Sequence, residues 1–191
     1  MYKNKILMIV MLINATFVMG QCPLVITYDA AGNRIYRGND CDPNCSLLVT
    51  TLLDDGPGSL RRAIQCAADG DTIKFAPAII GQYINLSTGE IPVNKSIFIT
   101  QTNSSIINVN ANNLGPIFNI VTGNTYLSHM RLAGSQETGK HGRSIINRSH
   151  LTLDNITIVD ADTVEGTGSS VMNYGDIIIT GNTKIIIGTT F

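Results

Sequence analysis

Short apolar runs that recur at a regular interval constrain the fold of this chain more than any other sequence feature. Three dipeptides, each an apolar residue followed by asparagine, recur about every 26 to 28 residues, and an apolar strand-like run follows each. A period of this length is typical of stacked coils. The asparagines would then sit at equivalent corners, where side-chain amides can hydrogen-bond along the stack. The dipeptides are Phe118-Asn119, Ile146-Asn147 and Met172-Asn173.

The runs themselves have the pattern of half-buried β-strands. Apolar and polar residues alternate in Leu151-Thr152-Leu153 and in Ile156-Thr157-Ile158, and a period of two places alternate side chains on opposite faces of a strand. Charged residues make up only 14% of the chain, and the runs are broken by Gly, Asn, Ser and Asp, which favour tight turns. The alternative to a solenoid is an antiparallel β-sandwich, whose short strands also recur at short intervals.

A short amphipathic helix is predicted ahead of the first coil, at about residues 59–69. Ser59 is a good N-cap residue, and apolar residues then recur at helical spacing. A helix this short is marginal alone, but it can cover the open apolar end of a solenoid. An ordinary surface helix would bury the same stripe. The stripe consists of Leu60, Ala63, Ile64 and Ala67.

The segment 49–75 and the strand runs after it resemble the beginning of a right-handed parallel β-helix of secreted bacterial surface proteins, of the pectate-lyase-like and autotransporter-adhesin-like kinds. The words that carry the resemblance are Asp54-Asp55-Gly56-Pro57-Gly58-Ser59-Leu60-Arg61 and Ala67-Ala68-Asp69-Gly70-Asp71-Thr72-Ile73. It extends over about residues 49–187. It implies an all-β solenoid at 49–191, with the helix as N-terminal cap and coils from residue 72 onward. Since core-like strands run almost to Phe191, we expect the last coil to be incomplete or to pair end-on with a partner.

Residues 1–20 have the layout of a secretory signal peptide. Lys3 and Lys5 precede an almost uninterrupted apolar run at 6–19. The run is too short to span a bilayer of roughly 30 Å as a helix. We therefore expect cleavage before Gln21 and a secreted or cell-surface protein. A lipoprotein anchored at Cys22 is the alternative.

Residues 21–48 are predicted to form a β-hairpin and a linker that contains cysteines. Gly32 and Asn33 can take the positive φ of a hairpin turn. The word Tyr28-Asp29-Ala30-Ala31-Gly32-Asn33-Arg34 resembles a single YD repeat of the Rhs/YD family. In that family the repeats are structural or carbohydrate-associated, and the alternative is a plain solvated hairpin.

The four cysteines predict two disulfides. Cys22, Cys41, Cys45 and Cys66 all lie in the first part of the chain, and an even number in an exported protein indicates disulfides with three possible pairings. We favour Cys22–Cys41 and Cys45–Cys66. A four-thiolate zinc site is the alternative, although a pair of Cys-x-x-Cys knuckles is missing.

Charge excludes one class of partner. The chain has 13 basic and 14 acidic residues, and removal of Lys3 and Lys5 with the signal leaves 11 basic against 14 acidic. Nucleic-acid binding asks for a clustered basic face, which this balance does not provide. The sequence predicts no cofactor, no metal and no transmembrane segment after signal removal.

Catalytic patterns are weak. A β-helix lyase would need clustered carboxylates for Ca²⁺ and a nearby base, and a hydrolase would need two carboxylates across the sugar bond. The histidines show no metal-ligand spacing. The candidate carboxylates are Asp154, Asp160, Asp162 and Glu165, the candidate bases are Arg131, Arg143 and Arg148, and the histidines are His129, His141 and His150.

We therefore expect a non-catalytic surface protein, an adhesin or a scaffold that contacts extracellular polysaccharide or cell-surface glycan. Tyr83, Tyr126 and Tyr174 could stack on sugars, with inward packing or isolated placement as the alternative. The alternative functions are a polysaccharide lyase or hydrolase of the pectate-lyase-like class and a purely structural spacer.

Overall fold

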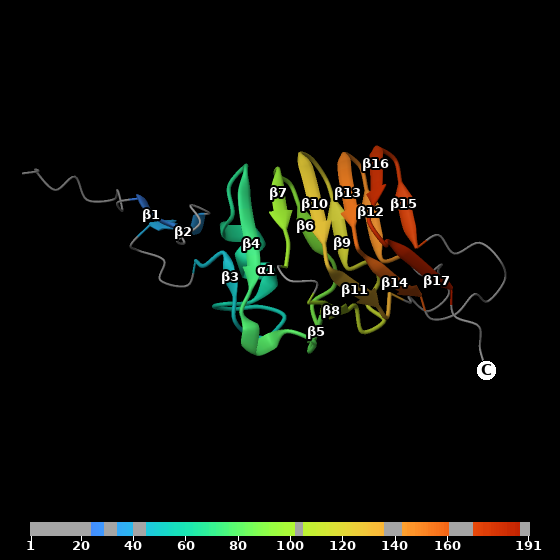
Figure 1. Ribbon diagram of the computed structural model, residues 1–191, viewed down its shortest axis with the longest axis horizontal. Coiled ribbons are helices and arrows are strands. Elements are labelled where there is room, and N and C mark those ends of the chain that lie inside the picture. The colour runs from blue at the N-terminus through green and yellow to red at the C-terminus, as the bar shows by residue number, and fades with distance from the viewer. Residues whose placement is uncertain are drawn as a thin grey trace, which may run out of the picture.

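The computed structural model is a parallel β-solenoid of about five turns (Figure 1). It describes the strands at 24–28 and 34–39 by their backbone, and residues 45–101, 105–135, 143–160 and 170–187. The chain passes through three sheets in turn and then returns to the first, so each coil contributes one strand to each sheet. The predicted parallel solenoid is confirmed, and the sandwich alternative is wrong for these sheets because their pairing is parallel.

The first sheet has six strands in the order β3, β4, β7, β10, β13 and β16. Their bounds are Leu48–Val49, Asp71–Phe75, Ile97–Ile99, Asn124–Ser128, His150–Asp154 and Asp176–Thr180. The second sheet contains β5 (Tyr83–Asn85), β8 (Ile107–Asn110), β11 (Met130–Ala133), β14 (Thr157–Asp160) and β17 (Lys184–Ile187). The third contains β6 (Ile91–Val93), β9 (Phe118–Ile120), β12 (Ile145–Asn147) and β15 (Val171–Asn173).

Aliphatic side chains stack in rows inside the coils. In the first sheet Ile73, Ile99, Leu127 and Leu153 occupy one register position in successive strands, and each is at most 1% exposed. Burial of such side chains contributes roughly 1.5–3 kcal/mol each. Ile179 continues the row in the last described coil and is 56% exposed.

A single residue in left-handed conformation turns the chain from the first sheet to the second in successive coils. His129 and Asn155 occupy this corner with φ of 54° and 53°, and Gly181 follows with φ of 61°. Glycine adopts this conformation without strain, whereas other residues adopt it at a cost, asparagine and histidine more often than most. Each of these residues directly follows the end of a first-sheet strand, β10, β13 or β16.

The cap helix α1 spans Leu60–Cys66 at the N-terminal end of the solenoid (Figure 1). The Ser59 hydroxyl accepts a hydrogen bond from the backbone N–H of Arg62, as an N-cap should. Leu60, Ala63, Ile64 and Ala67 are all buried in the same core cluster as the first coils. The helix ends earlier than the predicted 59–69 because Ala67 is already extended and the carboxylate of Asp71 accepts from the N–H of Ala68 at 2.7 Å.

Three smaller features complete the described chain. A 3₁₀ helix, η1, spans Pro77–Ile79, and β1 (Leu24–Tyr28) and β2 (Arg34–Asn39) form an antiparallel hairpin. The predicted signal peptide at 1–20 lies outside the described residues. No helix within the described ranges is both long and apolar enough to cross a membrane.

Candidate functional site

An aromatic pair, exposed at Phe98 and half-buried at Tyr126, lies on the outer face of the first sheet. Phe98 in β7 is 46% exposed, and its ring centroid is 5.8 Å from that of Tyr126 in β10, with the ring planes tilted by 47°. The two residues are register partners in neighbouring strands. Strands of one sheet lie about 4.7–4.9 Å apart, so stacking of the coils itself sets the two rings side by side along the solenoid axis.

Local sequence explains why both rings point outward. Ile97 and Ile99 flank Phe98 and are fully buried, and Thr125 and Leu127 flank Tyr126 and are buried too. Since side chains alternate along a strand, the residue between two inward-pointing side chains must face out. The register partners of Phe98 and Tyr126 in the neighbouring strands also face outward, and together these residues form one line, here called the central row. It consists of Thr72, Phe98, Tyr126, Thr152 and Ile178.

Polar side chains flank the central row on both sides. On one side His150 pairs in register with Asn124 and Asp176, and its Nδ1 lies 2.8 Å from Oδ2 of Asp176. On the other side the hydroxyls of Thr100 and Ser128 are 2.7 Å apart, and Ser128 is buried beneath the surface at 1% exposure. The outer face therefore combines a row of aromatic, threonine and isoleucine side chains with polar side chains at its margins, of which His150 and Asp176 are exposed.

A short hydrogen bond fixes the orientation of Tyr126. Its hydroxyl donates to Oδ2 of Asp154 at 2.7 Å, while Oδ1 of Asp154 accepts from the amide of Asn155 at 2.9 Å. Burial and the hydrogen bond to Asp154 raise the pKa of Tyr126. The phenol therefore stays neutral at physiological pH and presents a fixed aromatic face.

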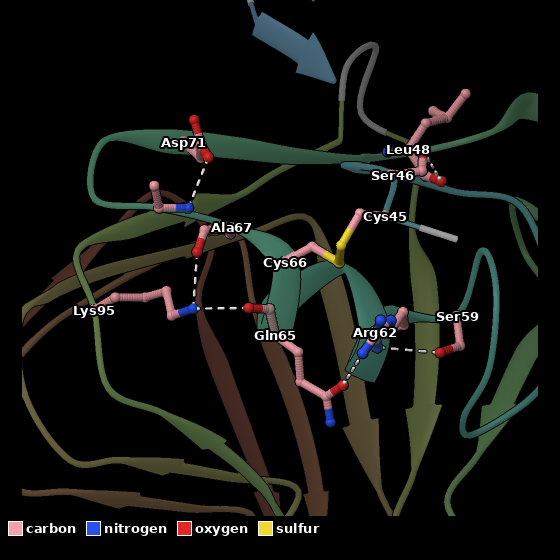
Figure 2. Close-up of a disulfide and its surroundings, with 11 residues drawn as sticks. Cys45, Ser46, Leu48, Ser59, Arg62, Gln65, Cys66, Ala67, Asp71 and Lys95 are labelled. Carbon is pink, nitrogen blue, oxygen red and sulfur yellow. Dashed lines mark hydrogen bonds between the residues drawn. A yellow bond between two sulfur atoms is a disulfide. The ribbon is translucent and has the colours of Figure 1, made fainter. Parts of the chain in front are cut away.

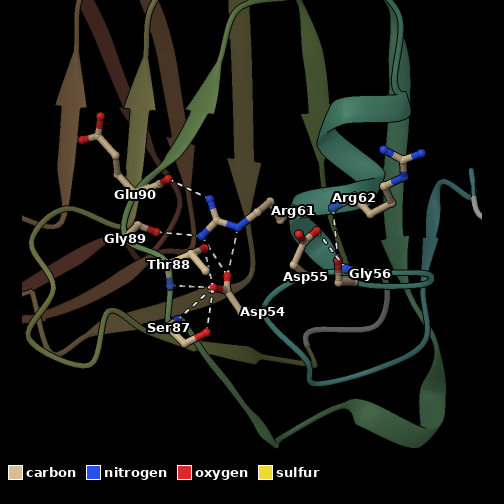
Figure 3. A network of polar contacts seen from close by, with 10 residues as sticks. Asp54, Asp55, Gly56, Arg61, Arg62, Ser87, Thr88, Gly89 and Glu90 are labelled. Atoms are coloured by element: carbon tan, nitrogen blue, oxygen red, sulfur yellow. Dashed lines mark hydrogen bonds and ion pairs between the residues drawn. The ribbon is translucent and has the colours of Figure 1, made fainter.

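A second polar cluster holds the cap helix to the first coil (Figure 3). One oxygen of Asp54 accepts from Arg61 in α1, and the other accepts from backbone and side-chain donors of Ser87 and Thr88. Arg61 also donates to the carbonyl of Gly89 at 2.7 Å. Burial opposes ionisation of Asp54, but the hydrogen bonds from Thr88, Ser87 and Arg61 outweigh it and lower its pKa to about 2. Both oxygens of Asp54 are occupied by these donors and the residue is buried, so its role is structural.

Cys45 and Cys66 form a disulfide at the end of the cap helix (Figure 2). Their Cα atoms are 5.5 Å apart. Lys95 donates its ammonium to the carbonyls of Gln65 and Ala67 beside it, which satisfies helix C-terminal acceptors. This is the pairing favoured from the sequence, whereas Cys22 and Cys41 lie outside the described residues.

Two of the three predicted asparagines stack. The amide of Asn147 donates to Oδ1 of Asn173 at 2.6 Å, and the two are register partners. Asn119 is one position out of register, because Ile120 pairs with Asn147. It binds Oε1 of Glu90 on the outer face instead. The recurrence of apolar-Asn dipeptides correctly indicated the coils. The register that it predicted for Asn119 is wrong by one residue.

Sequence reasoning missed a second amide pair. Asn110 donates to Oδ1 of Asn85 at 3.0 Å across β8 and β5. The two asparagines are 25 residues apart in the sequence. This spacing is shorter than the period of about 26 to 28 residues that identified the other coils, so the sequence pattern did not reveal the pair.

The candidate catalytic residues that the structure describes do not gather into one site. Asp154 and His150 belong to the first sheet, Arg131 binds the Tyr83 hydroxyl at 2.9 Å on the second, and Arg148 lies over the ring of Tyr174 at 5.3 Å. Arg143 precedes β12. His141, Asp162, Glu165 and the side chain of Asp160 lie outside the described residues. Within the described part of the chain, no group of three or more His, Cys, Asp or Glu residues could hold a metal ion.

The three tyrosines suggested for sugar stacking lie on different faces. Tyr126 is in the first sheet, Tyr83 in the second, and Tyr174 follows β15 of the third and is 63% exposed. Only Tyr126 has a ring partner among the described residues. Sequence reasoning missed that partner, Phe98, although its place between two isoleucines signalled an outward position.

Comparison of the chain with protein-family models, with curated proteins and with solved structures found no match in any of the three.

Proposed function

We propose that this protein is a non-catalytic secreted or cell-surface scaffold that contacts an extended glycan through the outer face of the first sheet. The observation that carries the proposal is the Phe98–Tyr126 pair, which is in register, is exposed at Phe98 and half-buried at Tyr126, and is bordered by polar side chains. The signal-like residues 1–20, the disulfide and the resemblance of residues 49–187 to surface β-helices support export.

The shape of the surface favours a polymer over a small molecule. Small-molecule sites are concave and bury most of the ligand, whereas the central row runs across five neighbouring strands on the outer face of one sheet. Sugar rings present apolar C–H faces and hydroxyl edges, so a chain of them can stack on aromatic rings while its hydroxyls bond to the polar margins. Stacking of the coils at about 4.7–4.9 Å sets successive residues of the row along the axis, with the two aromatic rings in adjacent coils.

The surface is also pre-organised. The hydroxyl of Tyr126 is hydrogen-bonded to Asp154 at 2.7 Å. The residues on either side of Phe98 and of Tyr126 in their strands are buried, which fixes the backbone beneath both rings. Less side-chain entropy is then lost on binding, and each side chain that needs no ordering saves about 0.5–1.5 kcal/mol. A rigid surface of this kind suits repeated weak contacts along a polymer.

A glycan-binding assay with the mature protein tests the proposal. We expect binding to one class of oligosaccharide and a loss of about tenfold in affinity for Phe98→Ala, as expected for removal of one aromatic contact. Tyr174→Ala, which removes an exposed aromatic ring beside the third sheet, is the matched control and should bind normally. Absence of binding to every glycan, or equal affinities for Phe98→Ala and the parent, would overturn the proposal.

A further inference from the structure

We infer that the glycan is a polymer of amino sugars that carry positive charge; this rests on the proposed function above. The inference comes from where the charges lie around the central row. Asp154 borders the row on one side of the Thr152–Ile178 segment, and Asp176 borders it on the other side in the neighbouring strand. A chain that follows the row passes between these two carboxylates.

Positive charge lies mainly on the other faces. Arg131 and Lys184 belong to strands of the second sheet, and Arg148 follows β12 of the third. Within the described strands of the first sheet, the basic residues are His150 and Lys74. Lys74 lies in β4, three strands away from the strand of Asp154. At about 4.8 Å per strand this is roughly 14 Å, beyond a Debye length at physiological ionic strength.

Both carboxylates can accept further donors. Asp154 already accepts one hydrogen bond on each oxygen, and a carboxylate has about four acceptor positions. The side chain of Asp176 is 78% exposed and approaches only His150 through Oδ2 in the contacts of the described residues. An ammonium group of an amino sugar supplies the donors and the opposite charge.

The aromatic pair points to the same chemistry. Aromatic faces attract cations, and an ammonium within about 6 Å of a ring centroid is stabilised. A sugar that stacks on Tyr126 brings its amino substituent toward Asp154, which is bonded to the same tyrosine. A uronic acid polymer would instead bring like charge to Asp154 and Asp176, which disfavours binding.

The test compares oligomers of equal length made of glucosamine, of N-acetylglucosamine and of galacturonic acid, by titration calorimetry at low and high salt. We expect the glucosamine oligomer to bind most tightly and the galacturonic acid oligomer most weakly. The preference for glucosamine should fall about threefold for Asp154→Asn and for Asp176→Asn, in line with exposed ion pairs, and it should shrink at high salt. Asp55→Asn, which removes the same charge from an exposed residue beside the cap helix, should change nothing.

The outcomes separate this inference from the proposed function. Equal binding of the charged and the N-acetylated oligomers, with no effect of either Asn variant, would overturn the amino-sugar inference and leave glycan contact standing. Equal displacement by a lysine oligomer would also overturn it, because the surface would then select charge and not sugar. Failure of all three oligomers together with a negative glycan array would overturn the proposed function itself.

Discussion

Asp54 and Arg61 form a buried ion pair that joins the cap helix to the first coil. Nε and Nη2 of Arg61 lie 3.0 and 2.8 Å from the same carboxylate oxygen of Asp54, and the two side chains are 9% and 5% exposed, Arg61 first. The other oxygen accepts from Ser87 and Thr88 in the turn between β5 and β6. One carboxylate thus holds together segments more than thirty residues apart (Figure 3).

Loss of this carboxylate should destabilise the fold. Asp54→Ala leaves the Arg61 guanidinium buried without its counter-charge, and breaking a buried pair in this way costs about 3–5 kcal/mol. Urea unfolding followed by circular dichroism measures the change. Asp55→Ala, a neighbouring exposed carboxylate, should stay within about 0.5 kcal/mol of the parent. If Asp54→Ala lowered the free energy of unfolding no more than Asp55→Ala does, the stabilising role of the ion pair would be contradicted.

Stability should fall in acid through the same residue. The pKa of Asp54 is about 2 in the folded protein against an ordinary 3.8, so the unfolded state binds more protons between these values. The contribution of Asp54, about 2 kcal/mol, is present above pH 4 and is lost as the pH falls toward 2. Unfolding of the parent and of Asp54→Asn should be compared across this range. Their difference in stability should shrink on acidification, and a constant difference would contradict the assignment.

The Cys45–Cys66 disulfide should stabilise the N-terminal end. It closes a loop with a sequence separation of 21, and loop-closure entropy for that length gives about 3 kcal/mol. The double variant Cys45→Ser with Cys66→Ser removes this disulfide without reducing the other cysteines. Its denaturation midpoint is compared with that of the parent protein. Chemical reduction of that variant provides the control for the remaining pair, Cys22 and Cys41. An unchanged midpoint in the double variant would exclude the predicted contribution.

His129 should be a site where substitution stabilises the protein. It adopts φ of 54°, and its Nδ1 is buried without a hydrogen-bond partner among the described residues. His129→Gly removes both costs at this corner and should raise stability by about 0.5–1 kcal/mol. His129→Ala removes the ring but keeps the strained conformation, so it should be less stable than the glycine variant. Thermal melting ranks the three proteins, and alanine equal to glycine would refute the strain argument.

Core and surface substitutions in the first sheet should behave differently. Leu127 is fully buried in the core of the solenoid. Leu127→Ala therefore leaves a cavity, and such substitutions lower the free energy of unfolding by about 2–5 kcal/mol. Phe98→Ala, one strand away on the outer face, should cost much less. Equilibrium unfolding of both variants checks the difference. If Phe98→Ala proved as damaging as Leu127→Ala, a loss of glycan binding in that variant would reflect misfolding.

Much of the fold could be predicted because each strand carries its own inside-outside pattern. The alternation in Leu151-Thr152-Leu153 indicated an inward and an outward face without knowledge of any partner strand. The N-cap Ser59 and the apolar stripe after it located the cap helix in the same local way. Only the helix end was displaced, since Asp71, outside the helix, binds the backbone of Ala68.

The candidate surface could be predicted only in part. Tyr126 was recognisable as an aromatic residue able to stack on sugars, but its ring partner Phe98 and the Asp154 that holds it lie 28 residues before and after it. Neither relationship follows from local pattern, because both depend on which residue of one coil faces which residue of the next.

The amino-acid sequence alone determined that the chain forms short strands with one buried face, a capped helix ahead of them and a repeat long enough for stacked coils, because these features depend on neighbours a few residues apart. Register was decided only in the tertiary structure. It moved Asn119 out of the asparagine stack, set Phe98 against Tyr126 and brought Asp54 to Ser87. Turns of unequal length shift each coil relative to the last, and backbone pairing between complete coils selects the alignment that fills the interior.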